Sequence, residues 1–439
     1  MAQKEHPPTP LTPDSILPVV SSANPKSALY VEELGRARAL LDLMATQYSM
    51  EREISCNPPS WTYINEIMKK ECNSTCLYIS CYGQDVFLWI LKTSGAIFFH
   101  RITVDNNGLP AKLATNLDAV FAIMANSMFS EEDCNDQSVH CMEPKPDSFQ
   151  ILTWCYKLLI DPVSGLLEEP SIIIVPEGGL CLFPFAALLD DKSGKYLSET
   201  FRIRTVPSLK TLKLIQDSPA DYHSQTGALV VGDPTVGEVI YRGSVSRKFV
   251  PLPGARKEAE MVGRLLDVQP LLGQYATKQA VLEMVMSASL IHIAAHGNAE
   301  RGEIALAPLN PTTVIPEEDD YLLTVSDISQ IQLRAKLVVL SCCHSGCGQI
   351  RSEEIIGIAR AFLGSGARSV LVAPWALNDE ATVQLMCRFY EHLVRGESAS
   401  ESLHQAMKWM RRNGFTKVSD WAPFTLIGDD VTFDFEKQK

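Results

Sequence analysis

The sequence predicts an α/β fold built on a mostly parallel sheet of six strands flanked by helices, and three observations support this. Short runs that are apolar on both faces recur through the second half of the chain, as is typical of strands buried in a parallel sheet. Stretches with helical spacing of apolar residues alternate with these runs, which indicates crossover connections. Residues 75–104 alternate aromatic and aliphatic residues and are punctuated at Gly83 and Gly95, which predicts an antiparallel meander.

Each element follows from the same patterns. The expected strands are 171–176, 228–234, 290–297, 336–343, 369–375 and 424–429. The expected helices between them are 255–268, 276–287, 352–365, 378–395 and 398–413. Closer to the N-terminus, apolar residues at helical spacing predict one long helix over 28–50 and another around 113–128.

These elements divide the chain into three expected segments. Residues 1–25 are rich in proline and serine, which predicts a disordered arm. Residues 26–147 hold the first helix and the meander, and we expect them to form an accessory part. Residues 148–435 hold the alternating strands and helices, and therefore the main α/β domain.

Composition narrows the class of protein. The chain has 439 residues, 46% of them hydrophobic, which is enough for a large core. Its net charge of −13 and the lack of a basic patch disfavour nucleic-acid binding. The start lacks a secretory signal, and no apolar run is long enough to span a membrane, so we expect a cytoplasmic protein without membrane contact. The 12 cysteines should then be mostly reduced.

Reactive side chains follow two of the expected strands. One strand ends with His296 and Gly297, and the next ends in "LSCCHSG", which contains Cys342 and Cys343. If the two strands are parallel neighbours, the imidazole and a thiol reach the same rim, and an imidazole can take the proton of a thiol. Alternation along the strand predicts that Cys342 packs inward and that Cys343 is the nucleophile. The N–H groups of Gly297 and Cys343 are then candidates for an oxyanion hole.

These residue types also have other possible roles. His292 lies on the same strand face as His296 and is expected to be a core histidine, although it is a rival base. A zinc site would need Cys342, Cys343, His344 and Cys347 to converge, but adjacent cysteines on an extended chain point apart and no second pair follows. We therefore expect no metal and no cofactor. His344 is expected to be exposed, and Cys347 could form a disulfide with Cys343 that switches the thiol off.

Two further residues are candidates for binding a substrate. Asp233 ends the strand "ALVVGDP", where a turn or capping role is the simpler interpretation. Orienting the His296–Cys343 pair, or binding a basic substrate side chain, is the alternative. Trp375 ends another strand and could belong either to the core or to a pocket wall.

Several motifs in order resemble the CHAT domain, a peptidase-like relative of caspases and separases that is often appended to tetratricopeptide repeats. They are "IHIAAHGN", "VVLSCCHSG", "VLVAPWALNDEA" and "DWAPFTLIGD", with "SIIIVPEGGLCLFPFAAL" upstream. The resemblance covers about residues 30–430 and implies a caspase-like sheet with a His296–Cys343 dyad. The 47-residue separation of the two residues is close to the spacing of about 50 in caspases.

The resemblance also implies a function. It implies a cysteine endopeptidase in which Asp379, just past a strand, selects a basic residue before the cut. The partners would be a protein substrate and a regulatory protein or repeat region, although no repeat array is visible in this sequence. A catalytically silent scaffold that keeps the fold for protein–protein interaction is the alternative.

Overall fold

The computed structural model describes most of the chain, with gaps between the described parts. The described residues are 24–50, 61–104, 117–128, 146–241, 243, 245–297, 302–309, 315–342, 357–374 and 378–435. The expected arm over 1–25 therefore lies almost entirely outside the described residues. So do Cys343, His344, Cys347 and Trp375.

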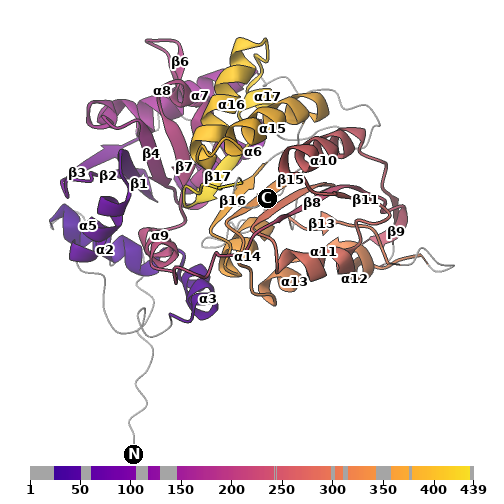
Figure 1. The fold of residues 1–439 in the computed structure, drawn as a ribbon. Coiled ribbons are helices and arrows are strands. Elements are labelled where there is room, and N and C mark those ends of the chain that lie inside the picture. Colours follow the sequence, from indigo (N-terminus) through magenta and orange to yellow (C-terminus); the bar gives the residue numbers. More distant parts are fainter. Residues whose placement is uncertain are drawn as a thin grey trace, which may run out of the picture.

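A single sheet of eleven strands forms the centre of the molecule (Figure 1). In spatial order the strands are β11 (Leu271–Gly273), β8 (Ala228–Pro234), β12 (Leu290–Ala295), β15 (Leu337–Cys342), β16 (Ser369–Val372), β17 (Thr425–Gly428), β7 (Arg202–Thr205), β4 (Ser171–Val175), β1 (Ser74–Tyr82), β2 (Asp85–Leu91) and β3 (Ile97–Thr103). Most neighbours are parallel; the antiparallel pairs are β16 with β17, β1 with β2, and β2 with β3. The mostly parallel α/β sheet predicted from the sequence is confirmed.

The first six strands of this order, β11 to β17, form the six-stranded part that the sequence predicts, with one exchange. The short strand β11 was missed, because its three residues carry too little pattern to separate from a loop. The segment 171–176 was counted in its place, but β4 lies on the other side of β17. Because β17 reverses the strand direction, the carboxyl end of β4 lies at the opposite rim from those of β8, β12, β15 and β16.

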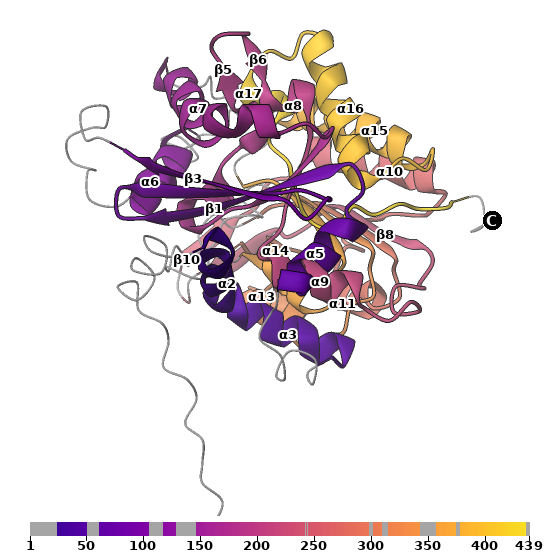
Figure 2. The same cartoon turned by 90° about the vertical axis from the view of Figure 1, so that its left-hand side faces the viewer.

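Helices cover both faces of the sheet (Figure 2). One face carries α6 (Leu117–Met128), α7 (Pro146–Leu159), α8 (Leu197–Thr200), α10 (Pro253–Leu266), α15 (Asp379–Leu393), α16 (Ala399–Arg412) and α17 (Val418–Trp421). The other face carries α2 (Pro25–Gly35), α3 (Arg38–Tyr48), α5 (Trp61–Lys70), α9 (Leu209–Gln216), α11 (Lys278–Val285), α13 (Val325–Ser329) and α14 (Ile358–Gly364). Large cores of buried apolar side chains fill the space on each face. No helix in the described part of the chain combines the length and the apolar character needed to cross a membrane.

The remaining elements are short. They are α12 (Glu318–Tyr321), the 3₁₀ turns η2 (Asp161–Leu166), η3 (Gly178–Leu182) and η4 (Phe185–Ala187), and the two-stranded pairs β5 (Leu189–Asp190) with β6 (Lys195–Tyr196), β9 (Glu238–Tyr241) with β10 (Val245–Lys248), and β13 (Ile304–Ala305) with β14 (Leu322–Leu323). Phe249, just after β10, packs with Tyr321 of α12 in a small cluster beside the main core.

The N-terminal helix differs from the single helix that the sequence predicts over 28–50. The chain forms α2 and α3 instead, with a break at Arg36 and a left-handed Ala37 (φ 53°). The buried guanidinium of Arg36 donates to Ile79 O at 2.9 Å and to Pro176 O at 3.3 Å, at the carboxyl ends of β1 and β4. It also forms an ion pair of 3.2 Å with Glu177. These tertiary contacts override the local helical periodicity.

Candidate functional site

The candidate site lies where the neighbouring strands β12 and β15 end. The two strands are parallel, and their last paired residues are Ala295 and Cys342. His296 follows Ala295 directly, and the sequence places Cys343 directly after Cys342. The expected neighbourhood of the two strand ends is thus present, whereas Cys343 itself lies outside the described residues.

Cys342 packs inward, as alternation predicts. Its side chain is fully buried with Val338 and Leu340 in the core on the α14 face of the sheet. The Cys342 thiol lies 3.3 Å from the carbonyl oxygen of Ile293, to which it can donate. A thiol in this position does not face the rim, so Cys342 is not available as a nucleophile.

The His296 imidazole is half-buried and held on two sides. Its Nε2 lies 2.8 Å from the carbonyl oxygen of Val250, and the ring of Phe249 packs edge-on at 5.1 Å. A carbonyl oxygen only accepts hydrogen bonds, so Nε2 must carry the hydrogen. In the neutral ring the lone pair then lies on Nδ1, and the Val250 carbonyl selects which nitrogen can act as a base.

The electrostatic surroundings keep this imidazole neutral. Burial is the largest effect and lowers the pKa of His296 below its ordinary value of 6.5. The positive charge of Arg247 also lowers this pKa. The hydrogen bond to Val250 raises it, and so do Asp233 and Asp379, which attract the imidazolium. A neutral imidazole near pH 7 is the form that can accept a proton from a thiol.

Asp233 belongs to the same rim and is fully engaged with its own chain. It adopts a left-handed conformation (φ 47°) near the end of β8. One carboxylate oxygen accepts the backbone N–H of Leu252 at 2.7 Å, and the other accepts Arg256 Nε at 3.1 Å. These contacts agree with the turn or capping role that the sequence favours for Asp233.

Asp379 is the exposed carboxylate of the site. It is the first residue of α15, after the N-cap Asn378. It lies against the first turn of α10, where a β-carbon on Gly254 would come within 2.7 Å of Asp379 Cγ. Gly254 thus leaves the space in which Asp379 sits beside the His296 rim.

Gly297 pairs with Ile304 in an isolated antiparallel bridge. The hydrogen bond in this bridge runs from Ala305 N to the His296 carbonyl at 2.9 Å and does not use the Gly297 N–H. The bridge fixes the backbone at His296 and Gly297, just past β12.

The rival base, His292, is a core residue as predicted. Its side chain is completely buried. Nδ1 shares a hydrogen bond of 3.0 Å with the hydroxyl of Tyr390, and Nε2 lies 3.3 Å from Glu258. These partners on α15 and α10 tie the sheet to the helices above it, and His292 does not reach the rim.

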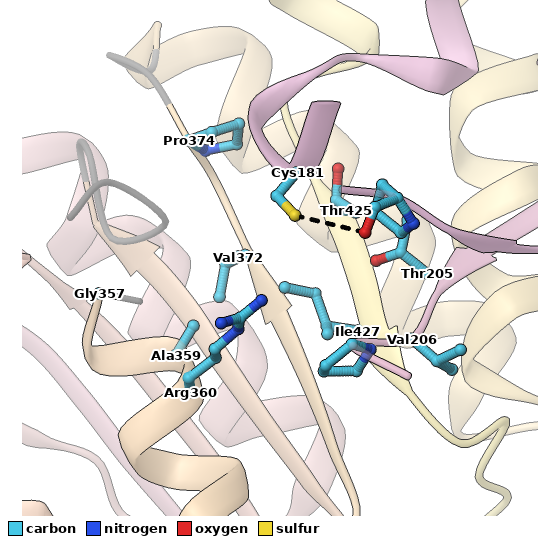
Figure 3. Close-up of a pocket in the computed structure, with 12 residues that line it drawn as sticks. Cys181, Thr205, Val206, Gly357, Ala359, Arg360, Val372, Pro374, Thr425 and Ile427 are labelled. Atoms are coloured by element: carbon cyan, nitrogen blue, oxygen red, sulfur yellow. Dashed lines mark hydrogen bonds between the residues drawn. The ribbon is translucent and has the colours of Figure 1, made fainter. Parts of the chain in front are cut away.

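The structure contains a pocket of about 40 Å³, and Figure 3 shows the residues that line it. The pocket lies between α14 and the part of the sheet where β17 meets β7. Among the residues that line it, Arg360 carries a charge. Cys181 lines it from η3, with its thiol 3.7 Å from the Pro176 carbonyl. None of His296, Gly297, Asp233 and Asp379 lines this pocket.

The described part of the chain holds no group of three or more His, Cys, Asp or Glu side chains that could bind a metal ion. Most of the zinc set weighed from the sequence lies outside that part. The one described member, Cys342, is buried in the core and bonded to Ile293 O.

Sequence reasoning missed the partners of His296. Phe249 and Val250 lie 46 or more residues upstream, after the hairpin of β9 and β10. Neither residue has chemistry that draws attention, since the contact uses a backbone carbonyl and an aromatic ring. The one available signal was "FVPLPGA", in which two prolines stiffen the chain just before a helix.

The mostly parallel sheet from β11 to β17, with helices on both faces, is a caspase-like fold. The chain shares its fold with a crystal structure of the Saccharomyces cerevisiae separase–securin complex. The match covers 96% of this chain and 35% of that one, with a TM-score of 0.53 and 12% identity. A second structure of the same complex covers 95% and 35%, with a TM-score of 0.50.

The sequence model of the CHAT domain matches residues 150–429, and the chain belongs to this family. It is 34% identical over 322 residues to tetratricopeptide repeat protein 28 of Homo sapiens and to the same protein of Mus musculus. These alignments cover 63% of this chain and 13% of each relative, so the chain spans a small part of the length of those proteins.

Proposed function

We propose that this chain is a cysteine endopeptidase with His296 and Cys343 as its catalytic dyad. The observation that carries the proposal is the hydrogen bond between His296 Nε2 and Val250 O, at the end of the strand beside the one that Cys343 follows. This bond places the lone pair, and therefore the basic nitrogen, at Nδ1 of an imidazole whose pKa is lowered by burial.

The register of the strands supports Cys343 as the partner of His296. Side chains alternate along a strand, and Cys342 lies on the α14 face. By the same alternation in the sequence we expect Cys343 to share the face of Val339, which packs in the core beneath α10 and α15. His292 contacts the same two helices, and His296 shares its face by the period of two.

The proposed reaction begins with proton transfer. His296 Nδ1 takes the thiol proton of Cys343, and the thiolate attacks the scissile carbonyl carbon to form a tetrahedral intermediate. The N–H groups of Gly297 and Cys343 stabilise its oxyanion. The imidazolium then protonates the leaving amine as the C–N bond breaks and the acyl-enzyme forms.

Hydrolysis completes the cycle. His296 Nδ1 takes a proton from water, and the hydroxide attacks the thioester carbon. The C–S bond breaks, the carboxylic acid product leaves, and the thiol is regenerated. This sequence needs no cofactor or metal.

The two carboxylates of the rim suggest a preference for a basic side chain before the cut. Asp233 is occupied by Leu252 N–H and Arg256, whereas Asp379 is exposed. We therefore assign recognition of an arginine or lysine side chain to Asp379, with Trp375 as a candidate pocket wall. Asp233 contributes to the site only through the electrostatic effect of its negative charge.

Labelling with an electrophilic peptide tests the proposal. The probe is a peptidyl acyloxymethyl ketone that ends in arginine, and mass spectrometry identifies the labelled residue. We expect wild type to be labelled at Cys343 and Cys343→Ala to be unlabelled, while Cys342→Ala keeps its label. Cys347→Ala, also labelled, controls for the neighbouring thiol.

The scaffold alternative makes the opposite prediction. The relatives are named for their repeats, and that name states no enzymatic activity. If wild type is not labelled, or if Cys343→Ala is labelled as fast as wild type, the dyad proposal is wrong and the scaffold reading takes its place.

A further inference from the structure

We propose that Asp233 is a positioning residue, which orients His296 through the backbone segment 250–252. The inference rests on the proposed role of His296 as the general base. Asp233 then serves to position the His296 ring and does not bind the substrate directly.

The conformation of Asp233 indicates that its placement matters. Its φ of 47° lies in the left-handed region, which non-glycine residues rarely adopt and which Asp and Asn tolerate best. Such a conformation persists only where the surroundings hold it, and it is often found near functional sites. Here it occurs on a buried residue, 8% exposed, next to the rim that carries His296.

Both carboxylate oxygens of Asp233 bind the start of α10. Oδ1 accepts the N–H of Leu252 at 2.7 Å, and Leu252 is the N-cap residue of α10 without a side-chain cap of its own. Oδ2 accepts Arg256 Nε at 3.1 Å, one turn into the helix. Asp233 thus anchors the backbone of residue 252 to β8.

The segment between Asp233's anchor and His296 is stiff. Val250 and Leu252 each precede a proline, Pro251 and Pro253, and a residue before proline is restricted to extended conformations. Proline itself has a fixed φ. Between the Leu252 N–H and the Val250 carbonyl lie only the φ and ψ of Pro251, and the ring fixes φ. Holding the N–H of Leu252 therefore restricts the direction of the Val250 carbonyl, which accepts Nε2–H of His296 at 2.8 Å.

The same contacts argue against a substrate-binding role. A carboxylate that already accepts a backbone N–H and a guanidinium would have to give up one of them to bind a substrate cation. Asp379 offers a matched comparison, because it also raises the pKa of His296 by its charge. No hydrogen bond among the described residues connects Asp379 with the 250–252 segment.

Nuclear magnetic resonance of ¹⁵N-histidine tests the proposal without any need for turnover. The parent is the full chain with Cys343→Ala, and His296→Gln identifies the signal. In the parent we expect one dominant tautomer with hydrogen on Nε2, and slow exchange of that hydrogen with water.

Asp233→Gly is the decisive variant, because glycine keeps the left-handed turn while both hydrogen bonds are lost. We expect the exchange rate of His296 Nε2–H with water to rise roughly fivefold to tenfold, which corresponds to the loss of about one hydrogen bond. The second tautomer should also gain population. Asp379→Asn is the control; it should shift the pKa of His296 slightly downward and leave exchange and tautomer unchanged.

An unchanged exchange rate and tautomer in a folded Asp233→Gly protein overturns the proposal. If Asp233→Gly does not fold, Asp233→Asn decides, since it keeps the turn, removes the charge that binds Arg256 and makes the charge-assisted bond from Leu252 N–H a weaker neutral one. It should raise exchange at least about twofold, and an unchanged rate overturns the proposal equally.

Activity gives a second readout where the proposed function holds. Asp233→Gly should lower kcat on an arginyl peptide with little change in KM, whereas Asp379→Asn should mainly raise KM. The reverse pattern would make Asp233 a substrate-binding residue. Failure of wild type to react at all refutes the proposed function and leaves the resonance test of Asp233 standing.

Discussion

At the scale of single residues, the site is an imidazole whose two nitrogens are made unequal by one carbonyl. Val250 O holds the hydrogen on Nε2 and burial keeps the ring neutral. The sequence was enough to predict that Cys342 packs inward, from alternation along its strand, and that His292 belongs to the core, from its place inside a strand that is apolar on both faces. The Val250 contact could not be predicted, since a loop conformation determines it and any residue could supply the carbonyl.

The pKa of His296 is expected to lie below 6.5 in the folded protein. Burial disfavours the imidazolium, and its effect exceeds the stabilisation by Asp233, Asp379 and the Val250 carbonyl. The measurement is the ring titration of His296 in Cys343→Ala, where no thiol couples to it. A pKa at or above 6.5 would show that the carboxylates outweigh burial.

At the scale of elements, the hydrophobic period predicted most of the helices and strands around the site. It predicted α10, α15 and α16 to within a few residues, because these are long amphipathic helices. It was wrong over 28–50, where the chain breaks at Arg36 so that the guanidinium reaches the carboxyl ends of β1 and β4. A tertiary interaction of this kind leaves no trace in the local period.

Replacing Arg36 with methionine is expected to destabilise the protein strongly. Arg36 is buried between Glu32 and Glu177, and its loss leaves two carboxyl groups without their cation. Breaking a buried ion pair from one side costs about 3–5 kcal/mol, which urea unfolding would measure. Glu177→Gln in the Arg36→Met background should recover part of the loss, and a loss below about 1 kcal/mol would show that the cluster adds little.

At the scale of the whole molecule, the segments expected over 26–147 and 148–435 contribute strands to one sheet in the described residues. The meander over 75–104 was recognised, but β1 pairs with β4 over Ser74–Tyr78 and extends the main sheet. Local patterns do not reveal which strands become neighbours, so the sequence could not join the two parts. The strands β17 and β7 are joined by the paired residues Ile427 and Thr205 and by side-chain bonds from Arg204 to Gly428 O and from Thr205 to Leu426 O.

A chain shortened to residues 148–435 is expected not to fold as a stable monomer. Removing β1 would leave β4 as an open edge and expose the core under α2 and α5, which includes Ile173 and Val175. Size-exclusion chromatography and thermal unfolding would show aggregation or no cooperative transition. A monomer that unfolds at the same temperature as the full chain would show that the segment 148–435 is an independent domain.

Acid is expected to weaken the fold through buried histidines. Burial lowers the pKa of His404 to about 4. As the pH falls below 6.5, the unfolded chain therefore takes up this proton before the folded protein does. The contribution of neutral His404 to the free energy of unfolding is present above pH 6.5 and is lost progressively toward pH 4. The variant His404→Leu lacks this proton uptake. Its free energy of unfolding relative to that of wild type should therefore rise by about 1–2 kcal/mol between pH 7 and pH 5. Urea unfolding at both pH values checks this, and a constant difference would contradict it.

The central claim is that His296 and Cys343 act as one catalytic unit, and the pH dependence of thiol alkylation tests it most directly. Iodoacetamide needs no substrate pocket, and the labelled peptide reports Cys343 alone. We expect Cys343 of wild type to react rapidly at pH 6, well below the ordinary thiol pKa of about 8.5. In His296→Gln the reaction should become fast only as the pH approaches that value. Two superimposable pH profiles would contradict the dyad.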